Sequence, residues 1–485
     1  MSLAAPEKTS NASVAEVSLP TAFVCNKSES MLSVIEKCLD NGLGTCLIVG
    51  DDRRLVGRIS LDDIRRGLVD GTAMVDPTLE WHLANGGASA TRLRNDIVHD
   101  GILQAVVDPS GYLTGVVIDR SIQPVQVAMP HMTRHEFRSL LDAFISGWIS
   151  SRGPYVQKFE REFSRFVGVR HGVAVSNGTV ALHLALVALG IGPGDEVIVP
   201  DLTFAATINA VLYCGATPVI VDVDCQTWCM SLESVKRACT AQTKAIIPVH
   251  LYGRPAEIGP IAEFARSRRI AVVEDCAEAH GARYGGRAVG QFGDVSCFSF
   301  YANKIVTTGE GGMCLTDSQE LATSLSVLRD HGMSPDRSYW HERVGYNYRI
   351  TNLQAAIGQS QLWRVNEVLQ RNARIAQLYQ EALEGIPGVR FPPALPDEYE
   401  PVVWMACVQV PADKRLPLMR AAHEAKIETR PFFHPLSNLP PYEKYGRVCP
   451  NSVELSATGV NLPTSSAVDE QIVERVARVF HDTLS

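Results

Sequence analysis

A lysine within an aromatic and hydroxylic segment is the residue of this sequence that most strongly suggests chemistry. Lys304 ends the segment Phe298-Ser-Phe-Tyr-Ala-Asn-Lys304, and the glycine-rich run Thr307-Thr-Gly-Glu-Gly-Gly312 follows it. Lysine is rarely buried unless it is paired or chemically engaged. Desolvation makes its amine a nucleophile toward carbonyl groups, as Schiff-base enzymes require. Taken alone, the segment is more often a surface lysine beside a glycine turn, so other residues must decide.

A second segment has the composition of a phosphate-binding turn. The strand-like run His171-Gly-Val-Ala-Val175 leads into Ser176-Asn-Gly-Thr-Val-Ala-Leu182, which has helical character. Such a turn directs free backbone N–H groups and the positive end of the helix dipole at one point, which suits a phosphate. An ordinary strand-to-helix connection has the same appearance, so this signal by itself is weak.

Asp275 ends the apolar run Ile270-Ala-Val-Val-Glu-Asp275, and an ionised carboxylate in such a setting needs a cationic partner. A protonated pyridine nitrogen is such a partner. Pyridoxal 5'-phosphate would therefore use all the parts: a phosphate for the turn, a ring for an aromatic side chain, a pyridinium for Asp275 and an aldehyde for Lys304.

The elements that must position these residues form an α/β pattern. Further short apolar strands are expected at 196–200, 218–222 and 245–249, each separated by a helical stretch. Strands that are apolar throughout and alternate with helices indicate a mostly parallel sheet covered on both faces. Ligands of such sheets gather at the carboxyl ends of the strands, where the turn, Asp275 and Lys304 are expected.

Residues 127–485 resemble the DegT/DnrJ/EryC1/StrS family of sugar-nucleotide aminotransferases, which have the fold-type I architecture and bind pyridoxal phosphate. The segments that carry the resemblance are Ser176–Leu182, Gly192–Pro200, Val249–Gly253, Glu274–Gly281, Phe298–Lys304 and Gly345–Arg349. The resemblance implies a homodimer with a shared active site, which a further contact could extend to a tetramer.

The resemblance assigns a role to each cofactor residue. Lys304 forms the Schiff base and moves the proton, and Asp275 holds the pyridine nitrogen protonated. Phe204 stacks on the ring, and Glu278 lies near its phenolic oxygen. The remaining implied contacts bind the phosphate: Gly178, Thr179 and Ser299 from one subunit and Asn347 from the neighbouring subunit.

The identity of residue 304 also selects the reaction. One branch of the family removes a sugar hydroxyl and has histidine at this position, whereas lysine favours transamination. The segments Tyr339–His341, Thr429–Phe433 and Asn461–Thr464 are most similar to the perosamine synthase branch. That branch aminates C4 of GDP-4-keto-6-deoxymannose, with L-glutamate as the expected donor. Amination at C3, or of a UDP- or dTDP-linked keto sugar, remains the alternative.

Substrate-binding residues are less well defined by the sequence. Arg349 and Arg430 are candidates for the donor carboxylate and the sugar diphosphate, because guanidinium binds both in a bidentate mode. Surface or capping arginines are an equal alternative. His331, His434, His280 and Tyr346 are further candidates for the sugar pocket, and for the histidines a core or turn position is at least as common.

The N-terminal part contains an internal repeat with a spacing of 58 residues. Cys46–Val49 and Leu55–Ile59 are expected to form a strand pair, which recurs at Gln104–Val107 and Leu113–Val117. Residues 20–122 resemble a tandem CBS module, a fold that commonly binds adenine nucleotides. Ser60 and Asp63 match the ribose-binding pattern, whereas Ile118 and Ser121 depart from it. A docking module without a ligand, or a nucleotide-sensing regulatory protein, is the alternative.

Composition limits the remaining possibilities. The 485 residues are 46% hydrophobic and carry a formal net charge of −8, which gives no basic surface for nucleic acid. No signal peptide, membrane helix or metal-spaced Cys/His cluster is expected, and the 12 cysteines indicate a reduced, cytoplasmic protein. We expect a lead-in at 1–20, the CBS-like module at 21–122, a linker at 123–130, the cofactor domain at 131–370 and a small α+β domain at 371–485.

Overall fold

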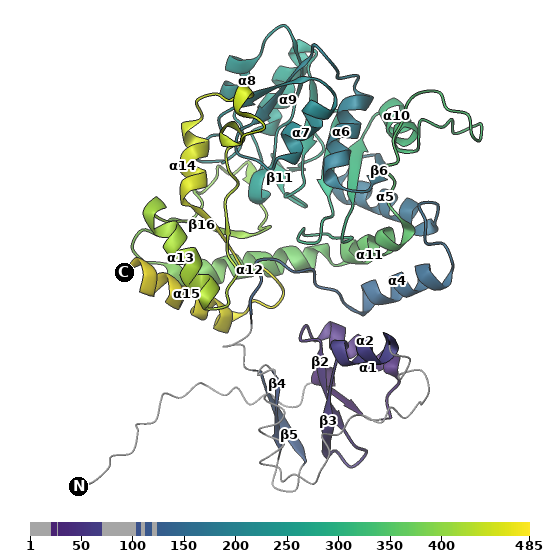
Figure 1. Cartoon of the computed structure of the whole chain (residues 1–485), viewed down its shortest axis with the longest axis vertical. Coiled ribbons are helices and arrows are strands. Elements are labelled where there is room, and N and C mark those ends of the chain that lie inside the picture. The colour runs from purple at the N-terminus through teal and green to yellow at the C-terminus, as the bar shows by residue number, and fades with distance from the viewer. Residues whose placement is uncertain (1–20, 27, 70–102, 108–111, 119–123) are drawn as a thin grey trace. The chain divides into compact units, whose positions relative to one another are not determined.

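The computed structural model describes residues 21–26, 28–69, 103–107, 112–118 and 124–485 (Figure 1). The chain divides into two compact units. One holds Met1–Gln123 with Met132–Arg134, and the other holds Pro124–His131 with His135–Ser485. The expected lead-in at 1–20, the turn at 108–111 and Ser121 lie outside the described residues. The remaining domain boundaries stay predictions.

The first unit contains two β-hairpins. Its elements are η1 (Thr21–Phe23), β1 (Val24–Asn26), α1 (Met31–Asp40), β2 (Thr45–Val49), β3 (Leu55–Ser60), α2 (Leu61–Val69), β4 (Leu103–Val107) and β5 (Leu113–Ile118). Strand β1 is parallel to β2, β2 is antiparallel to β3, and β4 is antiparallel to β5.

The two hairpins have the same register and the same irregularity. Ile48 pairs with Gly57 and Val106 with Gly115, and in each hairpin the register shifts at the next residue. An isolated bridge joins Arg54 to Tyr112, which is its equivalent 58 residues later. The geometry thus agrees with the internal repeat, while the likeness to a CBS pair stays a prediction.

Ser60 and Asp63 contact each other at the start of α2. The Ser60 hydroxyl donates to Asp63 Oδ2 over 2.6 Å, and the Asp63 amide donates to Ser60 Oγ over 3.1 Å. The Ser60 amide also donates to Asp63 Oδ2, at 2.9 Å. This is the reciprocal arrangement of a capping box. Helix capping therefore accounts for both side chains, and their assignment to a nucleotide site stays a prediction.

A seven-stranded sheet forms the centre of the second unit. Its order is β6 (His171–Val175), β14 (Gly312–Thr316), β13 (Val295–Ser299), β10 (Ala271–Asp275), β9 (Thr243–Ile246), β7 (Glu196–Pro200) and β8 (Thr217–Val221). Only β14 runs against the others. The strands are apolar along most of their length and nearly all of their residues are buried, as a sheet covered on both faces requires.

Helices cover this sheet and connect its strands (Figure 1). They are α5 (Pro154–Val167), α6 (Gly178–Ala188), α7 (Ala206–Tyr213), α8 (Leu232–Ala238), η4 (Leu251–Gly253), α9 (Ile258–Arg268) and α10 (Gln319–Arg329). Helix α4 (Arg134–Ile145) precedes them in the chain. Helix α5 begins five residues before the Phe159 that the sequence indicated. Pro154 is fixed near helical φ and needs no N–H acceptor at the first position, so it can start the helix there.

The C-terminal part begins with two consecutive helices and ends in a small sheet. Its elements are α11 (Asn352–Trp363), α12 (Val365–Leu383), β15 (Tyr399–Glu400), β16 (Ala406–Gln409), α13 (Ala412–Glu424), β17 (Arg430–Pro431), η5 (Leu436–Asn438), η6 (Glu443–Tyr445), α14 (Pro450–Thr458), β18 (Gly459–Leu462) and α15 (Glu470–Leu484). The small sheet has the order β16-β18-β17, and β15 pairs with β11 (Arg283–Tyr284), which also pairs with β12 (Arg287–Ala288). The expected boundary at 370/371 falls within α12.

Two of the expected elements differ from the structure. The alternating charged and apolar residues of 361–384 predict one long helix, but the helix is interrupted at Arg364, where φ is −107° and α11 ends. The apolar run 402–410 predicts a strand, but the strand is shortened to Ala406–Gln409. Trp404 before this strand instead turns its indole N–H to the Asn303 carbonyl, at 2.7 Å, so a side-chain contact replaces sheet pairing there.

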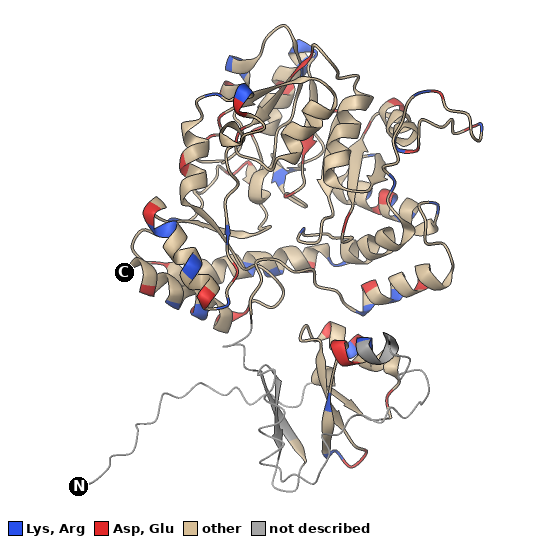
Figure 2. Cartoon of the chain, in the orientation of Figure 1, with Lys and Arg blue, Asp and Glu red and all other residues tan. Residues whose placement is uncertain are grey.

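The buried Asp201 and the partly buried Asp222 fasten the C-terminal part to the large sheet. Asp201 follows β7 and accepts from the amide and hydroxyl of Ser437, at 2.7 and 3.0 Å. Asp222 follows β8 and accepts from Asn451 and Ser452. Charges of both signs lie together on the outer helices α13 and α15 (Figure 2). Within the described ranges, no helix has the length and apolar character needed to span a bilayer.

Candidate active site

The carboxyl ends of three parallel strands in one half of the large sheet bring the predicted cofactor residues together. Strand β10 ends at Asp275, β13 ends at Ser299, and β6 leads into α6 at Gly178. A Cβ atom placed on Gly178 would lie only 2.8 Å from Ser299 Cβ, so these two residues are in direct contact. The sheet therefore assembles residues that are about a hundred positions apart in the sequence.

Lys304 lies in a turn beyond β13 and is held by a carboxylate and an aromatic ring. Its Nζ is 3.3 Å from Glu278 Oε1 and 3.7 Å from the centre of the Trp404 ring. Burial lowers the pKa of Lys304, and the carboxylates of Glu278 and Asp275 only partly oppose this shift. The lysine is thus a buried amine that loses its proton more easily than a solvated one, as a carbonyl nucleophile must.

Asp275 is buried at the strand end with an incompletely compensated charge. Its carboxylate accepts from the Thr207 hydroxyl at 2.9 Å and from the Ala277 amide at 3.2 Å. Burial nevertheless raises the pKa of Asp275, since these bonds and Lys304 offset only part of the desolvation. A cation beside this carboxylate would favour its ionised form.

Glu278 is the second buried carboxylate of the site. Its Oε2 accepts from the Tyr252 amide at 3.0 Å, while Oε1 faces Lys304. Burial raises the pKa of Glu278 despite the nearby lysine. Tyr252 adopts a φ of +51°, a left-handed conformation that is uncommon for a residue other than glycine.

The first turn of α6 presents backbone amides beside Ser299. The Asn177 side chain caps the helix by accepting from the Val180 amide at 2.9 Å. The amides of Gly178 and Thr179 precede Val180 and have no acceptor within the helix. The result is an anion-binding helix end with the Ser299 hydroxyl next to it.

Aromatic side chains border the site. Phe204 is 58% exposed, and its ring centre lies 5.8 Å from that of Phe433. Phe433 also stacks on Tyr252 at 5.4 Å, and its amide donates to the Tyr252 hydroxyl. His434 follows and is exposed, so it is available on this side of the site.

These residues fit pyridoxal phosphate. The Gly178–Ser299 contact leaves no room for a side chain at the helix end, which keeps its amides open to a phosphate. The buried charge of Asp275 is only partly compensated, so a pyridinium could pair with it. The ring of Phe204 is exposed and could stack on the cofactor ring. Lys304 offers the amine. The assigned roles remain predictions.

A second group of predicted residues lies at the end of β6. Arg349 pairs with Asp330 at 2.8 Å and donates to Asn347 Oδ1, and its Nη2 is 3.3 Å from His331 Nε2. His331 has a φ of +60°. Tyr346 is stacked with Tyr348 at 4.8 Å and packs edge-on to His183. Arg349 and Asn347 thus belong to one polar cluster within a single chain. Their predicted roles in binding the substrate anion and the neighbouring subunit's cofactor phosphate stay predictions.

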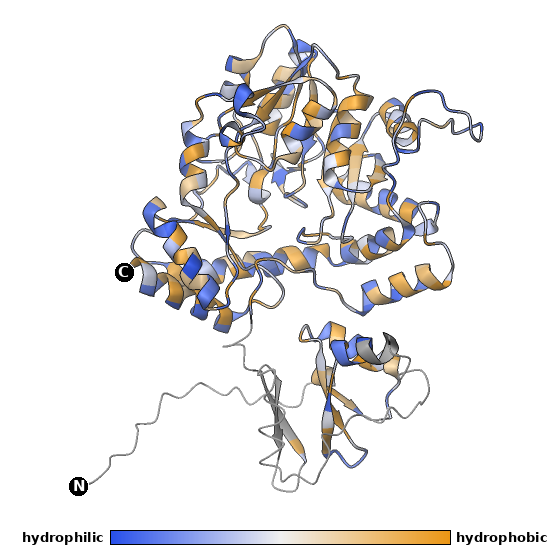
Figure 3. Ribbon diagram, viewed as in Figure 1, coloured by the Kyte–Doolittle hydropathy of each residue, from blue (hydrophilic) through white to orange (hydrophobic). Residues whose placement is uncertain are grey.

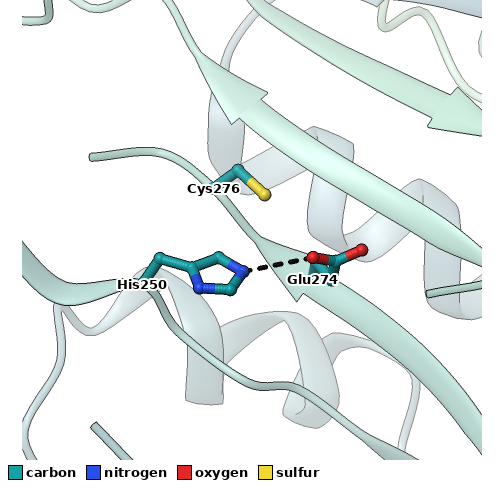
Figure 4. A group of neighbouring side chains, drawn as sticks. All are labelled: His250, Glu274 and Cys276. Atoms are coloured by element: carbon teal, nitrogen blue, oxygen red, sulfur yellow. Dashed lines mark hydrogen bonds and ion pairs between the residues drawn. The ribbon is translucent and has the colours of Figure 1, made fainter. Parts of the chain in front are cut away.

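His250, Glu274 and Cys276 form a buried cluster next to Asp275 (Figure 4). His250 Nδ1 accepts from the Ala256 amide, so its Nε2 carries the hydrogen and donates to Glu274 Oε2 at 3.2 Å. Glu274 also accepts from the amides of Gly290, Phe292 and Gly293. Burial alone would raise the pKa of Glu274, but these bonds hold it below its ordinary value. Hydrogen bonds occupy both ring nitrogens of His250 and both carboxylate oxygens of Glu274, and they fasten the loops at Ala256 and Gly290–Gly293.

His280 belongs to the hydrophobic core. Its ring lies among Phe163, Phe298 and Phe300, with centre distances of 5.4 to 6.0 Å. Burial lowers the pKa of His280 to about 3, which keeps the ring neutral. The core alternative for this histidine therefore holds.

Sequence reasoning did not assign Thr207 or Trp404 to the site. Thr207 is a fully buried hydroxyl in the first turn of α7, and Trp404 is a buried ring in an apolar run. For Thr207, the sequence offers one indication, which is a polar residue among the apolar residues of α7. Nothing in the sequence indicated that the indole of Trp404 would contact Lys304, because 100 residues separate them.

Comparison with known proteins gives consistent results. Residues 130–481 match the DegT/DnrJ/EryC1/StrS aminotransferase family. The chain is 43% identical over 370 residues to the GDP-perosamine synthase of Caulobacter vibrioides, spanning 74% of this chain and 98% of that protein. It resembles the structure of the aminotransferase TlmJ from Streptoalloteichus hindustanus, with a TM-score of 0.71, 32% identity, and coverage of 74% and 98%. The PLP form of the Streptococcus pneumoniae sugar aminotransferase Spr1654 gives a TM-score of 0.70 at 27% identity, with coverage of 74% and 98%.

Proposed function

The chain belongs to the DegT/DnrJ/EryC1/StrS aminotransferase family, and from this premise we propose that it transfers an amino group from L-glutamate to GDP-4-keto-6-deoxymannose, forming GDP-perosamine. The observation that carries the proposal is the 43% identity to a GDP-perosamine synthase over 98% of that protein. Lysine at position 304, buried against Glu278, supports transamination as the reaction.

The residues of the chain divide the work. Bound pyridoxal phosphate would supply an aldehyde for amines and a ring that accepts an electron pair. The amides of Gly178 and Thr179 with the Ser299 hydroxyl would hold its phosphate, and Asp275 would hold a proton on its ring nitrogen. Lys304 would then move the proton at the carbon that gains or loses the amine. Burial favours this role because it lowers the pKa of Lys304.

We further propose that the active enzyme is a homodimer that shares its sites. Phe144, Ile145 and Trp148 at the end of α4 are between 55% and 74% exposed. The second half of α4 is coloured as mostly hydrophobic in Figure 3. Large apolar side chains grouped in this way favour burial by association. Asn347 is exposed beside an isolated bridge to Asp330, and we propose that it reaches the cofactor phosphate of the neighbouring subunit. A tetramer through further contacts is compatible with this arrangement.

A panel of substrates tests the proposal. Purified protein with pyridoxal phosphate and L-glutamate is incubated with GDP-, UDP- and dTDP-linked 4-keto-6-deoxyhexoses, and the products are identified by mass spectrometry and NMR. We expect amination at C4 of the GDP sugar. If another nucleotide sugar is preferred, or if amination occurs at C3, the proposed substrate or position is wrong and the proposed transamination stands. Absence of any aminated product would refute the function.

Adenine nucleotide binding by the N-terminal unit is a separate proposal. It rests on the repeat of the two hairpins and on the position of Ser60 and Asp63 at the end of β3. Calorimetry with AMP, ADP and ATP on the full chain is the direct test. If a Ser60→Ala variant releases the same heat of binding as wild type, Ser60 and Asp63 do not bind the nucleotide.

A further inference from the structure

The segment that leads out of the N-terminal unit is joined to the C-terminal part by backbone hydrogen bonds, with an isolated parallel bridge between Val125 and Ile427. The Val125 amide donates to the Lys426 carbonyl at 2.9 Å, and the Glu428 amide donates to the Val125 carbonyl at 2.8 Å. Two residues after Val125, the Val127 carbonyl accepts a hydrogen bond from the Thr464 amide at 2.7 Å. The side chains of Val125 and Val127 are buried in the core. Residues 124–127 are thus firmly attached to the chain that precedes β17.

One carboxylate bridges this segment and an arginine at the site. Glu428 Oε2 accepts from the Val127 amide at 3.1 Å. Glu428 Oε1 accepts from Arg430 Nε at 2.9 Å and lies 2.9 Å from Arg430 Nη2. Each oxygen therefore serves a different partner, and the two partners are 303 positions apart in the sequence.

Arg430 can bind a second anion while it holds Glu428. A guanidinium carries five N–H donors in a rigid fork, and the pair with Glu428 engages only the side that carries Nε. The side with Nη1 remains for a carboxylate or phosphate. Arg430 lies three residues before Phe433, whose ring stacks on Tyr252, and the Tyr252 amide donates to Glu278 beside Lys304. The charge of Arg430 also opposes the protonation of Lys304.

We propose that Glu428 is a positioning residue that orients Arg430 for the substrate anion and couples this orientation to the segment 124–127. The inference rests on the proposed function, in which Arg430 binds the donor carboxylate or the sugar diphosphate. Anion binding at Arg430 and ordering of the segment then favour each other, because coupling between two sites is reciprocal. Glu428 acts through Arg430 and takes no part in the chemistry.

A set of full-length variants tests the positioning role. Glu428→Gln keeps one oxygen acceptor and removes the charge, and we expect the KM for L-glutamate or for the keto sugar to rise about fivefold, with kcat within about twofold. In an Arg430→Gln background the same change should alter KM by less than about twofold, because the group through which it acts is gone. Glu454→Gln is the matched control, since Glu454 forms an exposed pair with Arg390 at 3.7 Å.

Hydrogen exchange of residues 124–128 supplies a readout that does not depend on turnover. We expect faster exchange in Glu428→Gln than in wild type or Glu454→Gln, because the Val127 amide loses its charged acceptor. In the wild-type holoenzyme, saturating L-glutamate or GDP-perosamine should slow this exchange, and the effect should vanish in Arg430→Gln. This second measurement stands even if Glu428→Gln fails to fold.

The outcomes separate the two proposals. If Arg430→Gln raises a KM but Glu428→Gln changes neither KM nor exchange, the positioning role is wrong and the function of Arg430 stands. Additive effects of the two substitutions would also overturn the positioning role. If Arg430→Gln leaves both KM values unchanged, the substrate role of Arg430 and the inference built on it are both wrong.

Discussion

At the scale of single residues, the site is a buried amine between two buried carboxylates. Lys304 contacts Glu278 directly, and Asp275 acts on it through space. Burial shifts the pKa of each carboxyl group upward and that of the amine downward, which shows that the three charges do not fully satisfy one another. A cationic ring nitrogen would compensate the charge of Asp275, and an aldehyde would react with the free amine of Lys304.

Replacing Lys304 should abolish catalysis while leaving the fold. We expect Lys304→Ala to lower the rate of transamination by about 1,000-fold or more, because no other amine at the site can carry the proton. Lys304→Arg is the control that keeps the charge above the Trp404 ring but not the primary amine. Product formation is followed by mass spectrometry and folding by thermal unfolding. Transamination by either variant near the wild-type rate would contradict the assignment.

Asp275→Asn should affect both catalysis and the pH dependence of stability. The folded state raises the pKa of Asp275 above its ordinary 3.8, so it keeps a proton that the unfolded chain releases. Stability of the cofactor-free wild type therefore falls as pH rises from about 3.8 through the raised pKa. The variant lacks this loss, so its stability relative to wild type should increase across the same window.

Urea unfolding of the cofactor-free wild type and variant between pH 4 and pH 8 measures this difference in stability. In the presence of pyridoxal phosphate, we expect Asp275→Asn to slow transamination by about 100-fold. A stability difference that does not change with pH would show that Asp275 is not the titrating group.

At the scale of elements, the phosphate site depends on how closely α6 approaches the sheet. The antiparallel strand β14 makes this approach possible, because Gly312 faces the backbone of Asn177. A Cβ atom on Gly312 would lie 2.5 Å from the Asn177 carbonyl oxygen. The glycine-rich run after Lys304 thus serves the packing of the helix end as well as the turn.

The cap of α6 should be needed for cofactor binding as well as for stability. Asn177→Ala removes the acceptor for the Val180 amide, and Ser318→Ala removes the equivalent acceptor for the Leu321 amide at α10. Each should lower the free energy of unfolding by about 1 kcal/mol. Only Asn177→Ala should weaken pyridoxal phosphate, measured by equilibrium titration. Equal cofactor affinity in both variants would mean that the helix end does not hold the phosphate.

At the scale of the whole molecule, the proposed dimer predicts complementation between inactive chains. If Lys304 of one subunit and Asn347 of its partner form one site, mixing Lys304→Ala with Asn347→Asp should restore activity. Random reassociation leaves about a quarter of the sites with both residues intact. The two variants are unfolded together, refolded and assayed, with each variant refolded alone as the control. No recovery in mixed dimers would place both residues in the same subunit's site.

The α/β fold of the large domain could be predicted from the sequence, and the same residues predict the chemistry of the site. Apolar strands alternating with helices required a mostly parallel sheet, because each strand is buried on both faces. That sheet in turn required Asp275 and the turn at Ser176–Thr179 to meet at one edge. The lysine at 304 indicated the reaction, since side-chain identity needs no coordinates. These signals are local, and each is confined to a few consecutive residues.

Only the tertiary structure decided which distant residues complete the site. The ring of Trp404 lies beneath Lys304, the hydroxyl of Thr207 binds Asp275, and the carboxylate of Glu428 binds the Val127 amide. These contacts join residues that are 68 to 301 positions apart in the sequence. The structure likewise placed His280 in the core and joined Ser60 to Asp63 as a helix cap. Side-chain direction decides such contacts, and packing fixes that direction only when the whole chain has folded.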